Sequence, residues 1–563
     1  MQQGQFDRAA EDFKKVLELD PTLLEAQVNL GLAYQGLLEY EQATRYLVRV
    51  LRERPRMLGP NVIVGMDYLK LGSPEKGIPF LETALNLDPS NRDAREALAS
   101  SYMARDSFGA AAEQFRRIAD LNPDKTEAWF KLGHEYLNLA ARLAHRGAHL
   151  YRESPWGHRF LGDLFYERDR WQDAIVQYER ALASDPQEPG LHAAIGRAYL
   201  QAVKFDQAEA EFRSELQLDP NSEQAYLGLA NLALAQDQPS AALENLERVQ
   251  QISPEFLAVQ REFPWKSLED SNPAWRGKLS NAAARDDAGH SPCKTHRYSR
   301  CIASLEARKH LTDSEWLLLG TARLTLRRYG PAADALAQVR ATAPENAEAS
   351  YWLERTYQAL GAEAYAQLEE QFPDSWRTHH LRAESCVLRR KYQDALEEFR
   401  AALALNANEP ELHDGLGELY METNDFVAAE RELKQTLAVD SSRAHALYLL
   451  GRLYVLKGDN ERAVPYLERA LRIQPDLTAA NSLLGTAYLR LGQFANAVPR
   501  LEKAAPTDPS GNVHYQLFVA YRSLGQPERA RKELALSQDV RKSRFERDQT
   551  MIMGSPQPES EPQ

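Results

Sequence analysis

Residues 444–477 read AHALYLLGRLYVLKGDNERAVPYLERALRIQPDL, and this stretch decides the fold. It contains two apolar patterns with the spacing of an α-helix, separated by a polar turn at Gly458. The second pattern closes at Pro475, which donates no amide hydrogen bond and disfavours the helical conformation for the residue before it. The stretch therefore predicts a hairpin of two helices.

The same pattern recurs along most of the 563-residue chain. Prolines spaced 34 residues apart mark the period: Pro21, Pro55, Pro89 and Pro123, then Pro186, Pro220 and Pro254, and finally Pro475 and Pro509. A fixed period of this length is typical of helical repeats, in which each hairpin packs only on its neighbours. We therefore expect an all-α protein built as an α-solenoid.

The residue types at fixed places in the hairpin carry a family resemblance. On the first helix, helix A, they are Leu447, Leu450, Gly451 and Tyr454, and in another unit Trp129, Leu132, Gly133 and Tyr136. On the second helix, helix B, they are Ala463, Leu467 and Ala470, followed by Pro475. The chain resembles the tetratricopeptide repeat (TPR) family, which implies a right-handed superhelix in which the small residues let paired helices approach closely.

The period divides the chain into two arrays joined by an irregular insert. We expect the first array at 1–256, the insert at 257–312, the second array at 313–538, a capping helix at 539–553 and a disordered tail at 554–563. Each array holds about seven units. Residues 1–23 match only a helix B, so we expect an upstream helix, and with it a possible signal segment, to precede this chain. The compartment therefore stays open.

Two units depart from the pattern in their second half. The unit at 126–154 keeps helix A but continues as LAARLAHRGAHLYRESP, and the unit at 347–375 leaves room only for a short helix B between Gly361 and Pro373. We expect both to be local irregularities of the superhelix.

The insert carries the clustered chemistry, namely His290, Cys293, His296 and Cys301. These residue types can ligate zinc, but their order matches no common zinc module, and we predict no metal or other cofactor. A Cys293–Cys301 disulfide is expected in an oxidising compartment, and two unlinked thiols in a reducing one. The bond would stabilise the insert by about 2–3 kcal/mol.

Composition and motifs argue against several classes of function. The net charge of -13 is unfavourable for binding nucleic acid, which requires a basic face. No apolar run is long enough to span a membrane. The sequence lacks a phosphate-binding glycine loop, an HExxH or G-x-S-x-G motif, and a non-repeat block large enough for a catalytic domain. We therefore expect no enzyme activity and no small-molecule substrate.

A repeat array acts through its concave groove, which the resemblance assigns to the second, fifth and ninth residues of each helix A. In the second array the groove candidates are Tyr351, Arg355, Arg377, His380, Glu384, Asp414, Glu418, His445, Tyr448, Arg452 and Tyr515. Aromatic and arginine side chains often anchor protein interfaces, so we predict a scaffold that binds a protein or peptide there. Three alternatives remain open, one of which is a metal- or redox-responsive regulator that depends on the insert. The tyrosines could merely fill space between helices, or the chain could recruit substrates for a larger enzyme, sensor or membrane protein.

Overall fold

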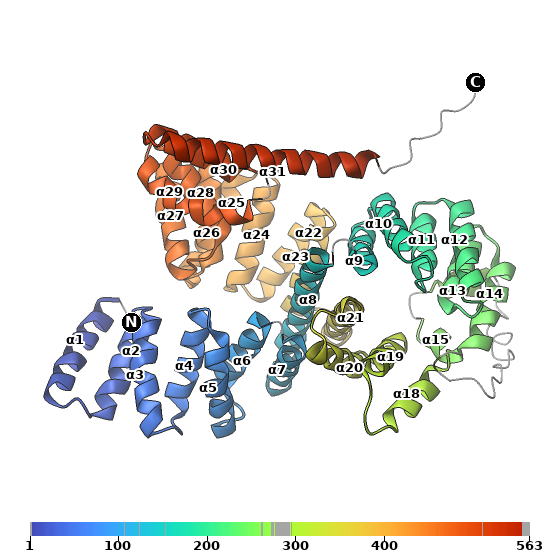
Figure 1. Ribbon diagram of the computed structural model, residues 1–563, viewed down its shortest axis with the longest axis horizontal. Helices are drawn as coiled ribbons and strands as arrows, with labels where there is room; N and C mark the ends of the chain where they lie inside the picture. Colours follow the sequence, from blue (N-terminus) through green and yellow to red (C-terminus); the bar gives the residue numbers. More distant parts are fainter. Residues whose placement is uncertain are drawn as a thin grey trace. The chain divides into compact units, whose positions relative to one another are not determined.

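The computed structural model describes residues 3–553 apart from 106, 123, 152–153, 261–262, 272–274, 276–292, 294–295 and 509. Every secondary-structure element in these residues is a helix (Figure 1). The predicted tail at 554–563 lies outside the described residues. The chain forms two compact units, residues 1–367 and 368–563, each described here by itself.

The first unit begins with hairpins at the predicted period. Its helices up to the insert are α1 (Gln3–Leu19), α2 (Leu24–Gly36), α3 (Tyr40–Glu53), α4 (Leu58–Lys70), α5 (Pro74–Leu87), α6 (Arg92–Ala104), α7 (Phe108–Leu121), α8 (Lys125–Leu150), α9 (Pro155–Tyr166), α10 (Trp171–Ser184), α11 (Leu191–Gln201), α12 (Phe205–Leu218), α13 (Glu223–Ala235) and α14 (Pro239–Ile252). The insert contributes α15 (Pro254–Ala258), α16 (Trp265–Ser271) and α18 (Tyr298–Glu306). Helices α19 (Asp313–Thr325), α20 (Tyr329–Thr342) and α21 (Ala347–Gln371) follow.

The second unit continues the repeat. Its helices are α22 (Trp376–Leu388), α23 (Tyr392–Leu405), α24 (Pro410–Glu422), α25 (Phe426–Val439), α26 (Ala444–Leu456), α27 (Asn460–Ile473), α28 (Thr478–Arg490), α29 (Phe494–Ala504), the short 3₁₀ helix η1 (Ala505–Thr507), α30 (Asn512–Ser523) and α31 (Pro527–Met553). The predicted cap at 539–553 is not a separate helix, because α31 runs on unbroken from the helix B of the last repeat.

The same backbone geometry, formed by different residue types, makes the turn from helix A to helix B in successive repeats. In the quoted hairpin Gly458 adopts a left-handed backbone conformation, with φ of 80°. The next amide, of Asp459, then donates a hydrogen bond of 2.9 Å to the carbonyl oxygen of Tyr454 on helix A. In the preceding repeat Asn424 takes the same place with φ of 61°. Asparagine tolerates this conformation better than most residues, so the turn does not require glycine.

The helix A glycines lie against a large helix B residue of the same hairpin. A Cβ atom added to Gly451 would lie 2.5 Å from the Leu467 side chain. The partner is sixteen residues further along the chain in each regular case: Gly31–Leu47, Gly65–Leu81, Gly162–Tyr178, Gly196–Phe212, Gly320–Leu336, Gly417–Leu433, Gly451–Leu467 and Gly485–Leu501. This sixteen-residue contact gives the predicted close approach of helices A and B.

The two irregular units break this rule in the same way. Helix α8 runs through 26 residues and α21 through 25 without turning back. The short helix B predicted between Gly361 and Pro373 is therefore wrong, since α21 continues straight through Gly361. Neither unit has a helix B of its own.

Each of the two long helices fills the place that a helix B would occupy for the other. The partner of Gly133 on α8 is Tyr365 of α21, whose ring an added Cβ would overlap. In turn, a Cβ on Gly361 would lie 2.8 Å from the side chain of Leu137. The rings of Tyr136 and Tyr357 stack with their centroids 6.0 Å apart. The two helices therefore pair antiparallel, with Gly133 and Gly361 at their closest approach.

This pairing gives residues 102–143 and 317–360 one shared hydrophobic core, formed by α7, α8, α20 and α21. The guanidinium of Arg116 on α7 binds the carboxylate of Asp334 on α20 at 3.0 Å. Figure 1 shows α20 and α21 returning beside α7 and α8 after the intervening repeats and the insert. The start of the predicted second array thus packs within the first unit, and the boundary between units falls after Gln367 rather than in the insert.

Candidate protein interaction surface

The first predicted groove residues of the second unit are buried between repeats. The Arg377 side chain is 4% exposed and binds Glu411 of the next helix A at 2.7 Å. His380 is also buried, and its ring lies 6.0 Å from that of Phe399 on α23. The assignment of Arg377 and His380 as partner anchors is therefore wrong, because an internal ion pair and the core already hold them.

Asp414 is another internal link. Its carboxylate forms an ion pair with Arg443, at the start of α26, and lies 3.7 Å from His445. The Asp414 carboxylate accepts from the protonated ring and so raises the pKa of His445, with burial partly opposing it. Asp414 joins two successive repeats and is buried, so it is not available to a partner.

The remaining candidates of the second unit stay accessible, and three of them lie on α26. We call His445, Tyr448 and Arg452 the α26 face. The side chains of His445 and Arg452 are 52% and 34% exposed, and Arg452 lies 3.6 Å from Glu422. The rings of His445 and Tyr448 are 6.3 Å apart.

Other accessible candidates flank this face along the chain. Tyr515 is 45% exposed, with the guanidinium of Arg541 over its ring at 5.5 Å. Glu418 is exposed. Glu384 is half-buried beside His380, at 3.4 Å.

Tyr351 and Arg355 belong to the first unit and bind its own α9. The Tyr351 hydroxyl donates a hydrogen bond of 2.6 Å to Asp163. Arg355 binds Glu167 at 2.8 Å and lies 4.0 Å from Asp163. Both residues thus contact a helix of the same chain. Tyr351 is buried in this contact, so the prediction that it lies open in a groove is wrong, whereas the Arg355 side chain remains 37% exposed.

The α9 side of this contact is an aromatic and charged cluster that we call the α9 face: Trp156, Arg159 and Asp163. The Arg159 guanidinium lies between three rings, 5.4 Å from Trp156, 4.9 Å from Tyr351 and 5.3 Å from Trp352. It also binds Glu188 at 3.2 Å. A desolvated cation over several aromatic faces is a strong form of cation–π contact.

The charges of the α9 face are balanced partly by residues of α21. Burial raises the pKa of Asp163, but Arg355, Arg159 and the two tyrosine hydroxyls outweigh it and hold that pKa below its usual value. One hydroxyl is that of Tyr178, which donates to Asp163 at 2.5 Å. Burial raises the pKa of neighbouring Glu354 to about 8. The cluster is most stable with Asp163 ionised and Glu354 protonated.

Sequence reasoning missed the α9 face, although the signal was present. Counting from Pro155, the first residue of its unit, Trp156, Arg159 and Asp163 are the second, fifth and ninth residues. The TPR resemblance assigns these positions to the groove, and the candidates named from the sequence all lie in the second array. Reading the same register in the first array would have found them.

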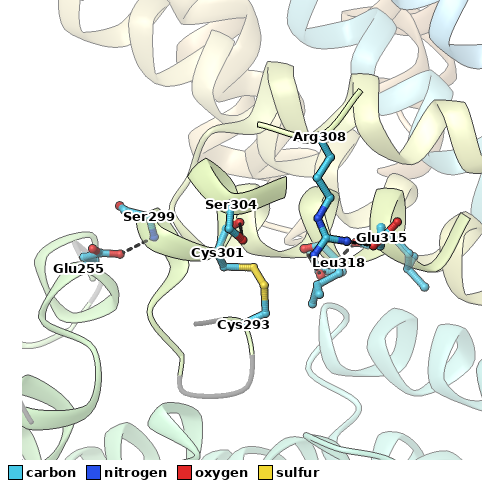
Figure 2. The surroundings of a disulfide bond; sticks show 10 residues. Glu255, Cys293, Ser299, Cys301, Ser304, Arg308, Glu315 and Leu318 are labelled. Atoms are coloured by element: carbon cyan, nitrogen blue, oxygen red, sulfur yellow. Dashed lines mark hydrogen bonds and ion pairs between the residues drawn. A yellow bond between two sulfur atoms is a disulfide. The ribbon is translucent and has the colours of Figure 1, made fainter. Parts of the chain in front are cut away.

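Cys293 and Cys301 are joined in the structure by a disulfide bond with an S–S distance of 2.04 Å (Figure 2). Cys301 lies in a small core with residues of α18, α19 and α20, while Cys293 is half-buried. On the same segment, the backbone amide of Ser299 donates to Glu255 at 2.9 Å. The disulfide thus lies where the insert bridges α15 and α19.

His296, one of the four zinc candidates, binds two carboxylates instead. Its ring nitrogens lie 3.3 Å from Asp219 and 2.8 Å from Glu223. Burial lowers the pKa of His296, but these two partners outweigh burial and raise it to about 10. The histidine is therefore a cation, and the cysteine sulfurs are bonded to each other, so neither is arranged as a metal ligand. His290 lies outside the described residues.

Two statements hold for the part of the chain that the structure describes. No group of three or more metal-ligating side chains occurs there. Among the same residues, no helix combines the length and the apolar character that a bilayer crossing requires.

The chain is similar to several curated proteins. It is 30% identical over 335 residues to BBSome complex member BBS4 of Bos taurus, covering 58% of this chain and 60% of that protein. It is 23% identical over 274 residues to DnaJ homolog subfamily C member 3 of Gallus gallus, covering 44% and 50%. It is 26% identical over 157 residues to the general transcriptional corepressor trfA of Dictyostelium discoideum, covering 28% and 9%. The chain spans less than two thirds of the length of each.

Solved structures are similar at lower identity. MamA is 20% identical, covering 31% of this chain and 96% of its own, with a TM-score of 0.28. A chain of the APC/C hetero-tetramer Cut9–Hcn1 is 15% identical, covering 96% of this chain and 91% of that one, with a TM-score of 0.29.

Family models match the repeats themselves. Two models described as tetratricopeptide repeat match residues 65–126, 96–134, 193–255, 359–410 and 415–478, and residues 454–516. A third, described as TPR repeat, matches residues 1–37 and 162–203. Together they cover more than half of a chain whose described elements are paired helices with sixteen-residue glycine contacts. The chain belongs to the tetratricopeptide repeat family.

Proposed function

We propose that this chain is a non-catalytic scaffold that binds a partner protein or peptide on the α26 face of its second unit. Proteins of the tetratricopeptide repeat family typically mediate interactions between proteins. The observation that carries the proposal is that His445, Tyr448 and Arg452 stay accessible, although His445 and Arg452 each lie near a carboxylate of the preceding repeat, whereas Arg377 and Asp414 are buried in their ion pairs.

The α26 face combines apolar area with directional polar groups. Tyr448 is half-buried against the core of the second unit, so its ring is held in place before a partner arrives. Arg452 faces Glu422 at 3.6 Å, an exposed pair that costs little to exchange for another carboxylate. Preorganised tyrosine and arginine side chains are frequent hot spots of interfaces.

These groups indicate the chemistry of the partner segment. Tyr448 offers a ring face to an apolar side chain, and Arg452 offers a bidentate fork to a carboxylate. His445 is an additional cation when protonated, and its pKa is raised. We therefore propose a partner segment with an apolar anchor followed by an acidic residue.

Affinity capture on the intact protein, followed by mass spectrometry, identifies the partner. Its affinity is then measured for Tyr448→Ala and Arg452→Ala, with Arg472→Ala as a matched control, because Arg472 is exposed on helix B of the same repeat. We expect at least a tenfold loss of affinity for the first two and none for the control. A fall in melting temperature with unchanged affinity per folded molecule would show that these residues only fill space.

A further inference from the structure

A cavity lies along the second half of α8 in the first unit. Regular helices A such as α26 span 13 residues, whereas α8 runs through 26. One side of this extension is buried, with Leu139 and Leu143 in the core that α8 shares with α21. Another side lines the cavity, which has a volume of about 780 Å³. The extension therefore creates a surface that a regular repeat does not have.

The described residues that line this cavity form one stripe along the helix. Steps of three or four residues place side chains on the same face of a helix. We call the following six residues the α8 stripe: Met103 of α6, and Ala141, Arg142, His145, Arg146 and Leu150 of α8.

The α8 stripe is basic, although the chain has a net charge of -13. Arg142 and His145 are exposed and Arg146 is half-buried, and none of the described residues that line the cavity is acidic. Arg142 donates a hydrogen bond of 3.1 Å to the carbonyl oxygen of Met103, so its guanidinium is already held beside the cavity. An acidic segment is therefore attracted to this stripe and repelled by the net charge of the rest of the chain.

The stripe also offers apolar area. Leu150 is 49% exposed, Ala141 is exposed and Met103 is half-buried. A helix laid along α8 would present its own side chains at the same spacing of three or four residues. The cavity volume falls within the range of ligand sites, about 300–1,000 Å³. Because a phosphate backbone has no apolar face to set against Leu150, the stripe favours an amphipathic helix over nucleic acid.

We propose that the α8 stripe binds an acidic amphipathic helix of a partner protein. Carboxylates of that helix pair with the guanidinium groups of Arg142 and Arg146, which match a carboxylate with two parallel hydrogen bonds. Its apolar side chains rest on Leu150 and Met103. The stripe lies in the first unit, so this second interaction surface does not rest on the function proposed for the α26 face.

The first experiment measures how tightly the full-length protein binds a fluorescent peptide of four Glu-Leu-Ala-Glu repeats, which forms an acidic amphipathic helix. We expect the variant Arg142→Gln/Arg146→Gln to bind this peptide at least about tenfold more weakly. The matched control Arg45→Gln/Arg213→Gln removes the same charge at two exposed positions outside the cavity and should keep the affinity of the unsubstituted chain. A peptide with Gln in place of every Glu should not bind.

Four results would overturn the proposal. An equal loss of affinity in both double variants would show attraction to net charge alone. Competition by an oligothymidylate of equal charge would indicate a nucleic-acid site. Self-association of the protein that Arg142→Gln/Arg146→Gln removes would identify a second copy as the occupant. Binding lost in Arg452→Ala but kept in Arg142→Gln/Arg146→Gln would place the peptide on the α26 face, which leaves the proposed function intact.

A second measurement needs no variant and therefore does not depend on the folding of a substituted chain. Hydrogen exchange is followed in the unsubstituted protein as the acidic peptide is added. We expect amides of residues 141–150 to exchange at least about threefold more slowly at saturating peptide, with those of α10 unchanged and no effect of the Gln peptide. Exchange in α8 that stays constant while the peptide is bound would overturn the proposal.

Discussion

In the repeat at 444–477, Gly451 meets Leu467 on its own hairpin, whereas in the repeat at 126–154 Gly133 meets Tyr365, 232 residues further along the chain. The helix A patterns of the two repeats are nearly the same, with Leu, Gly and Tyr at the same spacing. What differs is the origin of the helix that covers them. A helix A pattern therefore specifies a surface to be covered, and it leaves open which segment covers it.

This difference also determines how many helices a destabilising substitution affects. A regular repeat passes strain only to its neighbours, so the array behaves as a one-dimensional chain of units. The α8–α21 pair connects repeats that are far apart in sequence, so residues 125–367 should unfold together. Four predictions test this comparison.

The largest effect is expected for Asp163→Asn. The substitution removes the anion that Arg159 and Arg355 face in a desolvated cluster, so it should lower the free energy of unfolding of the first unit by about 3 kcal/mol. Hydrogen exchange followed by mass spectrometry should show α9 and α21 loosening together. The exposed Asp476→Asn in a regular repeat is the control, with a change below about 0.5 kcal/mol. Loosening of α9 alone would contradict the proposed linkage.

Gly133→Leu and Gly451→Leu compare the two kinds of repeat directly. Each overfills a tight helix contact and should cost about 2–3 kcal/mol. We expect Gly133→Leu to speed amide exchange in α8 and in the distant α21, and Gly451→Leu to affect only α26, α27 and adjoining helices. Gly59→Ala is the control, since no atom lies within 4 Å of its added Cβ, and it should be neutral or stabilising. If the amide protection of α21 is unchanged in Gly133→Leu, α21 does not cover Gly133.

The third prediction concerns the Cys293–Cys301 disulfide, which lies where the insert bridges α15 and α19. We expect peptide mapping without reductant, on protein from its native compartment, to recover Cys293 linked to Cys301. The double variant Cys293→Ala/Cys301→Ala should lower the stability of α18–α20 by about 2 kcal/mol, because the closed loop constrains the unfolded chain. Cys386→Ala is the control, since that cysteine is free. Two unmodified thiols in the native protein would exclude the bond.

The most local effect is expected at Asp67, a buried acid in the regular repeat at 58–91. It is 1% exposed, and neither carboxylate oxygen has a hydrogen-bond partner among the described residues. Burial raises its pKa to about 7 from the ordinary 3.8. The folded state therefore binds this proton more tightly than the unfolded chain, and stability falls as the pH rises from about 4 to about 7.

Asp67→Asn removes this ionisation and should therefore stabilise the protein at pH 8 by about 3 kcal/mol, since each unit of the pKa difference corresponds to about 1.4 kcal/mol. The gain should disappear near pH 4, where both forms are neutral, as melting temperatures across this range will show. Exposed Asp93→Asn serves as the control, with no pH-dependent gain. A gain that is constant from pH 4 to pH 8 would mean that Asp67 does not titrate.

Local order was predictable because its causes are local. The boundaries of α26 and α27 follow from apolar spacing, from the turn at Gly458 and from Pro475, all within one repeat. The candidate site was only partly predictable. Tyr448 and Arg452 remain accessible, but the burial of Arg377 and Asp414 depends on Glu411 and Arg443 of the following repeats. The position of a residue in helix A does not show whether its side chain is accessible or paired with a residue of the next repeat.

The sequence by itself determined the helices, the 34-residue period and the glycine positions where helices must approach closely. It did so because helix spacing, proline and turn residues act over a few neighbouring positions. Only the tertiary structure decided that α21 covers Gly133, that Tyr351 and Arg355 serve the α9 face, and that the first unit extends to Gln367. Those contacts join residues some 190 to 230 positions apart, and the accumulated rotation of every intervening repeat sets whether they can meet.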